Sequence, residues 1–166
     1  SFNNLINTLS NKNIKLDFLS RNDTINLEKD IIINVFSPHF MSENKNENSI
    51  VFSLDYKDIS FLFTGDMEKP NELDVINSYD LEEIDFLKVS HHGSYTSSSD
   101  EFIKEVSPDI SVISCGYKNR YGHPHKSVLD TLKKYNSLIY RTDISGDLIF
   151  YSDGYTIYTK KNYKKE

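Results

Sequence analysis

The sequence has a single cysteine, no apolar run long enough to cross a bilayer and no excess of positive charge. One cysteine, Cys115, cannot form an internal disulfide, and it leaves the redox compartment open. A membrane-spanning helix needs roughly 18 or more consecutive apolar residues, and neither such a run nor a signal peptide is present. The net charge of −6 argues against nucleic-acid binding through a broad basic surface, but it allows an enzyme that holds one phosphodiester through metal ions.

What is present fits one domain. The chain has 166 residues, of which 37% are hydrophobic and 13% aromatic, and these values argue against disorder and allow a real core. The sequence opens Ser-Phe-Asn-Asn without an initiator methionine, so we expect it to be cut from a longer protein. Its location therefore stays open between the cytoplasm and an extracellular or membrane-associated position given by a missing segment.

The apolar periodicity predicts alternating strands and helices. Helices are expected over 2–9, 68–78, 100–106 and 127–135. Strands are expected over 14–19, 31–36, 84–89, 110–115, 138–140, 148–151 and 155–158, and a hairpin is expected from 50–56 with 59–63. We interpret 41–48 as an exposed loop and the lysine-rich C-terminus as a solvated end. This order predicts an α/β fold.

Two histidine clusters follow strand-like runs. His91 and His92 come after the apolar run 86–89, and His123 and His125 follow the run 110–115. Open α/β sheets place their active sites at the carboxyl ends of strands. Asp66 follows the run 59–63 by three residues, so it is expected at the same edge. Carboxylate and imidazole side chains without thiolates suit zinc, manganese or iron, so this pattern predicts a metal site.

Single motifs of this kind are weak signals, and several residues have simpler readings. His39 is expected in an exposed loop, and Cys115 as a small strand residue without an activating context. Arg141 is open between a contact to an anion and a place in a turn with Asp143. If the strand 84–89 continues, His91 and His92 alternate, so that one would bind metal and the other would donate a proton or contact an anionic oxygen.

The motifs taken in order resemble the metallo-β-lactamase fold. Asn48-Ser49, FLFTGD, LKVSHHGS, ISCG, NRYGHPH and RTD follow one another as they do in the branch of ComEC-type DNA-uptake proteins. The resemblance implies an αββα sandwich, of which 1–166 would be a single partial domain holding the second half. It implies two divalent metal ions, zinc or manganese.

The resemblance also implies roles for individual residues. Asp66 would be the metal-bridging carboxylate, and His91 and His92 would supply a metal ligand and a neighbouring catalytic contact. His123 is assigned to the catalytic group. The residues expected to contact substrate are Ser94, Asn119, His125 and Arg141.

Two departures limit the resemblance. The H-x-H-x-D-H motif of the family is absent, and we expect it upstream of Ser1, in a missing N-terminal half of the same domain. Asn48-Ser49 also stands where many relatives carry a histidine. The chain would then hold half a site, and by itself we expect it to be inactive.

The predicted function is that of a metal-dependent hydrolase, a phosphodiesterase or nuclease, with a nucleic acid or another phosphodiester as substrate. Metal ions would activate water and stabilise charge on the phosphoryl oxygens. Two alternatives stay open: hydrolysis of a non-nucleic ester or lactone, and an inactive binding or scaffolding module.

Overall fold

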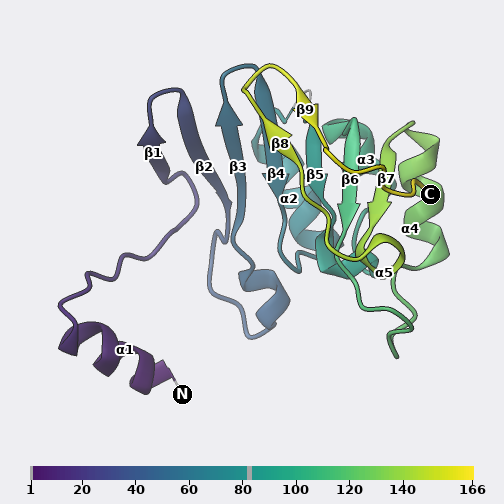
Figure 1. Ribbon diagram of the computed structural model, residues 1–166. Helices are drawn as coiled ribbons and strands as arrows, with labels where there is room; N and C mark the ends of the chain where they lie inside the picture. Colours follow the sequence, from purple (N-terminus) through teal and green to yellow (C-terminus); the bar gives the residue numbers. More distant parts are fainter. Residues whose placement is uncertain (1, 82–83) are drawn as a thin grey trace.

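A computed structural model describes residues 2–81 and 84–166, and its centre is a mixed sheet of seven strands in the order β1-β2-β3-β4-β5-β6-β7 (Figure 1). Neighbours from β1 to β4 are antiparallel, and neighbours from β4 to β7 are parallel. The strands are β1 (Thr24–Glu28), β2 (Ile31–Ser37), β3 (Val51–Tyr56), β4 (Ile59–Phe63), β5 (Phe86–Lys88), β6 (Ile110–Ile113) and β7 (Leu138–Arg141).

A helix connects each pair of parallel strands, as parallel pairing requires. These crossover helices are α2 (Lys69–Ser78), α3 (Asp100–Val106) and α4 (Lys126–Lys134). Pro70 stands in the first turn of α2, and the Ser99 side chain caps α3 by accepting from the Phe102 amide at 3.3 Å. All three helices were predicted, with boundaries that differ by no more than one residue at either end.

Strand alternation gives the sheet two apolar faces. Leu62, Leu87, Ile113 and Ile139 belong to the core shared with helix residues such as Val75, Phe102 and Leu132. Phe86, Val112 and Tyr140 point to the opposite face and pack against the C-terminal segment, which contains β8 (Tyr151–Ser152) and β9 (Ile157–Tyr158). In Figure 1 this segment crosses the face of the sheet opposite the helices.

Several expected elements differ from the structure. The predicted strand at 14–19 is wrong: this stretch is irregular, and Ile14, Leu16 and Phe18 are exposed. Alternation alone is insufficient, because a strand needs a partner for its backbone groups. The strand that forms in this part of the chain is Thr24–Glu28, which pairs with β2 and was not among the expected strands.

The ends of the chain also show differences. Helix α1 (Phe2–Asn11) forms as predicted, but it has no buried residue and extends away from the sheet (Figure 1). The 148–151 and 155–158 strands shorten to two residues each, and α5 (Thr142–Ser145) replaces an expected turn. A 3-10 turn at Lys45–Asn48 lies within the expected exposed loop. Within the described residues, no helix is both long and apolar enough to cross a membrane.

Candidate active site

Asp66 lies just after β4, in a turn fixed by residues from other strands. Gly65 has a φ of +53°, and a Cβ there would lie 3.1 Å from the Ser49 Cβ, so the close approach favours glycine. The Asp66 amide donates to Ser49 Oγ at 3.0 Å, and Thr64 Oγ1 donates to the Lys88 carbonyl at 2.7 Å. Ser49 therefore shapes the turn that presents the half-exposed Asp66 carboxylate.

His91 and His92 lie on a turn, and the prediction that they continue a strand is wrong. Strand β5 ends at Lys88, and both histidines have left-handed backbones with φ values of 46° and 56° inside the turn Ser90–Gly93. The His91 amide donates to the Gly65 carbonyl at 3.0 Å, which joins this turn to that of Asp66. The two side chains therefore do not point to opposite faces of a sheet.

The hydrogen bonds of His92 determine which ring nitrogen carries hydrogen. Its Nδ1 lies 2.7 Å from the Ser114 carbonyl, which can only accept, so Nδ1 is the donor. In the neutral ring, Nε2 then presents its lone pair, and it lies 3.7 Å from Asp66 Oδ1. Two acceptors that face one another are suited to share a cation, either a proton or a metal ion.

His91 has a similar arrangement with side-chain partners. Thr96 Oγ1 donates to Glu68 Oε1 at 3.0 Å, so its oxygen is free to accept from His91 Nδ1 at 3.3 Å. Glu68 Oε1 is itself 3.4 Å from His91 Nδ1. These acceptors favour hydrogen on Nδ1 and leave Nε2 of His91 as a possible ligand.

Glu68 is held in its charged form. Partial burial favours the neutral carboxyl, but hydrogen bonds from Thr96, Asn46 and Asn44, together with the charge of His91, outweigh it and lower the pKa of Glu68. Neither Glu68 nor Thr96 was assigned to the site from sequence. Glu68 follows Asp66 by two residues and Thr96 follows the LKVSHHGS motif by two, but their contact with His91 depends on the folded loops.

His123 lies close to the other histidines. Its ring centroid is 6.0 Å from that of His91, 6.4 Å from that of His92 and 4.9 Å from that of His125. Burial and the neighbouring imidazoles lower the pKa of His123, so it is neutral at pH 7. Two turns meet here, because a Cβ on Gly93 would lie 2.6 Å from the Pro124 Cβ.

His125 and His92 carry hydrogen on different ring nitrogens. The Tyr95 amide can only donate, and it donates to His125 Nδ1 at 3.2 Å. In the neutral ring, Nε2 of His125 therefore carries the hydrogen and can donate to an anionic oxygen. The His125 amide bonds the Gly93 carbonyl at 2.9 Å, which fixes the residue at the start of α4.

The remaining predicted substrate contacts have internal partners. Asn119 Nδ2 donates to the carbonyls of Gly116 at 3.0 Å and His123 at 2.6 Å, and its Oδ1 accepts from the His123 amide at 3.0 Å. Ser94 is buried, with its Oγ 3.0 Å from Thr96 Oγ1. In this structure both residues shape the loops around the histidines, and their contact with substrate stays a prediction.

Arg141 already has two carboxylate partners. It donates to Asp143 at 3.1 and 2.8 Å and to Glu166 at 3.0 Å, and its side chain is 15% exposed. These bonds favour the turn interpretation over the anion contact. Nearby, burial raises the pKa of Cys115 to about 11, so the thiol has no activating environment. The expectation that Cys115 is a strand residue is wrong, because β6 ends at Ile113.

Lys88 is a further charged group near Asp66 that sequence reasoning missed. It lies at the end of β5, and its Nζ donates to the Val89 carbonyl at 3.0 Å. Burial lowers the pKa of Lys88, and the negative charge of Asp66 opposes this shift. The Asp66 carboxylate therefore has a partly buried cation beside it.

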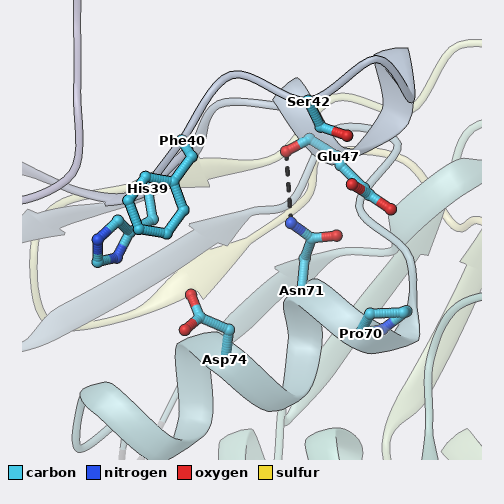
Figure 2. Close-up of a pocket in the computed structure, with 7 residues that line it drawn as sticks. All are labelled: His39, Phe40, Ser42, Glu47, Pro70, Asn71 and Asp74. Carbon is cyan, nitrogen blue, oxygen red and sulfur yellow. Dashed lines mark hydrogen bonds between the residues drawn. The ribbon is translucent and has the colours of Figure 1, made fainter.

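A separate cavity of about 270 Å³ lies between the 39–47 loop and α2 (Figure 2). Asn71 Nδ2 donates to the Glu47 carbonyl at 3.3 Å across it. Arg21 contacts His39 and pairs with Asp74 at 2.9 Å. The lining includes His39 but none of the four clustered histidines, so the fifth histidine lies outside the site.

The donor chemistry fits a divalent metal ion. Asp66 and His92 present an oxygen and a lone-pair nitrogen to one another, and the Nδ1 partners of His91 and His92 resemble the outer contacts that orient metal-binding imidazoles. Among residues 2–81 and 84–166, no three His, Cys, Asp or Glu side chains are arranged to hold an ion together. Two bound metal ions therefore stay a prediction.

The sequence over residues 13–117 matches the model of the metallo-β-lactamase superfamily, and the chain belongs to this family. Among curated proteins, it is 36% identical over 136 residues to ComE operon protein 3 of Bacillus subtilis, an alignment that covers 81% of this chain and 17% of that protein. It is 39% identical over 115 residues to Recombination protein 2 of Haemophilus influenzae, covering 69% and 14%.

The chain thus spans about one sixth of the length of these relatives. Among solved structures, it resembles a proposed metal-dependent hydrolase of Parabacteroides distasonis, with a TM-score of 0.53 and 17% identity. That likeness covers 81% of this chain and 61% of the other, and it concerns the fold alone.

Proposed function

We propose that the chain contributes to a metal-dependent phosphodiesterase that acts on nucleic acid. The observation that carries this proposal is the geometry of His92. Its Nδ1 is bonded to the Ser114 carbonyl at 2.7 Å, and its Nε2 faces the Asp66 carboxylate at 3.7 Å. A carboxylate oxygen opposite an oriented imidazole lone pair is suited to hold a divalent ion.

In this proposal Asp66 and His92 hold one of the two predicted ions, and His91 supplies a ligand to the other. A bound divalent ion supplies a Lewis acid that neutralises phosphoryl charge and lowers the pKa of water. Glu68 and Thr96 hold the His91 ring through Nδ1, and Ser114 holds that of His92. The remaining metal ligands would come from outside residues 1–166, and this is part of the proposal.

The other two histidines have separate tasks. Nε2–H of His125 donates to a non-bridging phosphate oxygen, and this contact orients the diester. A ring nitrogen of His123, neutral at pH 7, accepts a proton during the reaction. Both imidazoles lie within reach of one substrate group, because their centroids are 4.9 Å apart.

The choice of a nucleic-acid phosphodiester is supported by the names of the relatives. They are named for the ComE operon, for recombination and, in Neisseria gonorrhoeae, for competence. Histidine donors and a metal centre complement an anionic diester better than a neutral lactone. For the present chain, both the specificity for a nucleic-acid diester and a role in competence are part of the proposal.

The test is hydrolysis by the full-length protein, purified with zinc or manganese. We expect turnover of bis(4-nitrophenyl) phosphate and of an oligonucleotide, and loss of both in excess EDTA with recovery when metal is restored. Hydrolysis of a lactone but of neither diester would replace the proposal by the ester alternative. Turnover of none of them, with metal bound, would support a binding module.

A further inference from the structure

The loop between β6 and α4 carries two exposed tyrosines beside the histidine cluster. Tyr117 is 73% exposed and Tyr121 is 61% exposed. Each has a cation next to it in sequence and over its ring: Lys118 Nζ lies 5.2 Å from the Tyr117 centroid, and the Arg120 guanidinium lies 4.9 Å from that of Tyr121. In a chain of net charge −6, this loop concentrates aromatic and positive groups.

The loop is directly continuous with the site. The Tyr121 ring is stacked on that of His123, with centroids 5.6 Å apart and an interplanar angle of 22°. Tyr121, His123 and His92 line one small cavity of about 190 Å³ with Cys115, Gly116 and Asn119. A group held against Tyr121 would therefore lie next to the imidazoles that we assign to metal and phosphate.

A third exposed tyrosine lies beside His125, on the loop that follows the histidine pair. Tyr95 is 61% exposed, and its ring meets that of His125 edge-on at 5.0 Å and 83°. Exposed tyrosines therefore accompany both His123 and His125.

Internal bonds hold the Tyr117–Tyr121 loop in place. Asn119 bonds the carbonyls of Gly116 and His123, and the Gly122 amide donates to the Asn119 carbonyl at 3.3 Å. The exposed rings are thus presented on a braced loop. Aromatic rings with adjacent cations are the elements with which proteins bind unpaired bases and the phosphates between them.

We propose that Tyr121 and Tyr117 form a stacking platform for nucleobases of a single-stranded nucleic acid, and that Lys118 and Arg120 neutralise its flanking phosphates. In a duplex both faces of each base are already stacked, so the platform favours unpaired strands. The inference rests on the proposed function and adds the substrate class, a single strand whose bases are read by stacking rather than by sequence.

The test measures binding to the full-length protein in EDTA, so that the probes stay intact. The probes are an oligothymidylate, an abasic oligonucleotide with the same number of phosphates, and a blunt duplex of the same length. We expect the oligothymidylate to bind about 5- to 150-fold tighter than the abasic probe, the range for one stacked base. An oligouridylate tested in parallel shows whether DNA or RNA is preferred.

Three variants test whether the Tyr121 ring causes the preference for the probe that contains bases. Tyr121→Ala should weaken oligothymidylate binding and leave abasic binding unchanged, and Tyr121→Phe should retain the preference because it keeps the ring. Tyr155→Ala is the matched control: Tyr155 is also 61% exposed, with Lys57 Nζ 4.5 Å from its ring centroid, but it lies in the β8–β9 turn. This control should retain the full preference.

Equal affinity of the unaltered protein for the oligothymidylate and abasic probes would overturn the inference. So would a Tyr121→Ala variant that binds both probes more weakly by the same factor. The proposed function is judged separately, by hydrolysis of bis(4-nitrophenyl) phosphate, which has no nucleobase. Hydrolysis without base preference would remove only the inference, and base preference without hydrolysis would remove only the proposed reaction.

Discussion

The two halves of the sheet differ in strand direction and in the connections between strands. From β1 to β4 the strands are antiparallel, and hairpin turns or loops join consecutive strands. From β4 to β7 they are parallel, and each crossover carries a helix that packs into the main core. All four clustered histidines follow strands of the parallel half, whose carboxyl ends meet at one edge.

Strand β4 belongs to both halves, and this explains the position of Asp66. It pairs antiparallel with β3 and parallel with β5. Its end is braced from the antiparallel side by Ser49, and from the parallel side by the Lys88 carbonyl and the His91 amide. The antiparallel half therefore supports the site, and the parallel half supplies its imidazoles.

The largest expected effect is that of removing the Asp66 carboxylate, which follows β4, the strand shared by the two halves. Asp66→Ala in the full-length protein should lose bound metal and bring hydrolysis of bis(4-nitrophenyl) phosphate below detection, because it removes a ligand. Asp58→Ala, in the exposed turn of the β3–β4 hairpin, is the control and should leave both unchanged. Full metal content in the Asp66 variant, measured by elemental analysis, would place the metal elsewhere.

Next in size is the difference among the histidines. His123→Ala should keep its metal and lose about 10² to 10⁴ in kcat if the imidazole accepts a proton, whereas His92→Ala should lose metal together with rate. His39, outside the cluster, gives the control His39→Ala. Metal stoichiometry beside turnover decides: equal metal loss in the His123 and His92 variants would make His123 a ligand.

The two halves should also differ in their contribution to stability. Leu87 in β5 is 1% exposed, so Leu87→Ala should lower the free energy of unfolding by about 2–5 kcal/mol. Leu27 in β1 is 53% exposed, and Leu27→Ala should change it by no more than about 0.5 kcal/mol. Urea unfolding of both variants measures this; comparable losses would mean that β1 is covered in the protein in solution.

The smallest predicted effect concerns the support of His91. Glu68→Gln removes the charged acceptor near Nδ1 and should weaken metal affinity about 10- to 100-fold, as is typical of contacts to a ligand's second nitrogen. Glu47→Gln, from the neighbouring loop, is the matched control. Competition with a chelator measures the affinity, and an unchanged value for Glu68→Gln would show that Thr96 alone orients the ring.

Sequence periodicity predicted the strands and crossover helices of the parallel half, with ends that differ by no more than two residues. The runs around Leu62, Leu87 and Ile113 were found because strands buried on both faces are almost continuously apolar. The strand at 14–19 was predicted wrongly because alternation does not say whether a partner strand exists. The positions of His91 and His92 were also predicted wrongly, because their spacing in the sequence does not show that they lie on a turn after Lys88.

The amino-acid sequence indicated the family and a candidate site of carboxylate and imidazole groups, because glycine, aspartate and histidine follow apolar runs in a specific order. Which nitrogen of each imidazole faces the site depends on contacts made only in the folded protein. His92 takes its partner 22 residues away at Ser114, and Tyr95 reaches His125 across 30 residues. Such contacts depend on loops from different strands meeting at one edge, and a local pattern in the chain does not encode that meeting.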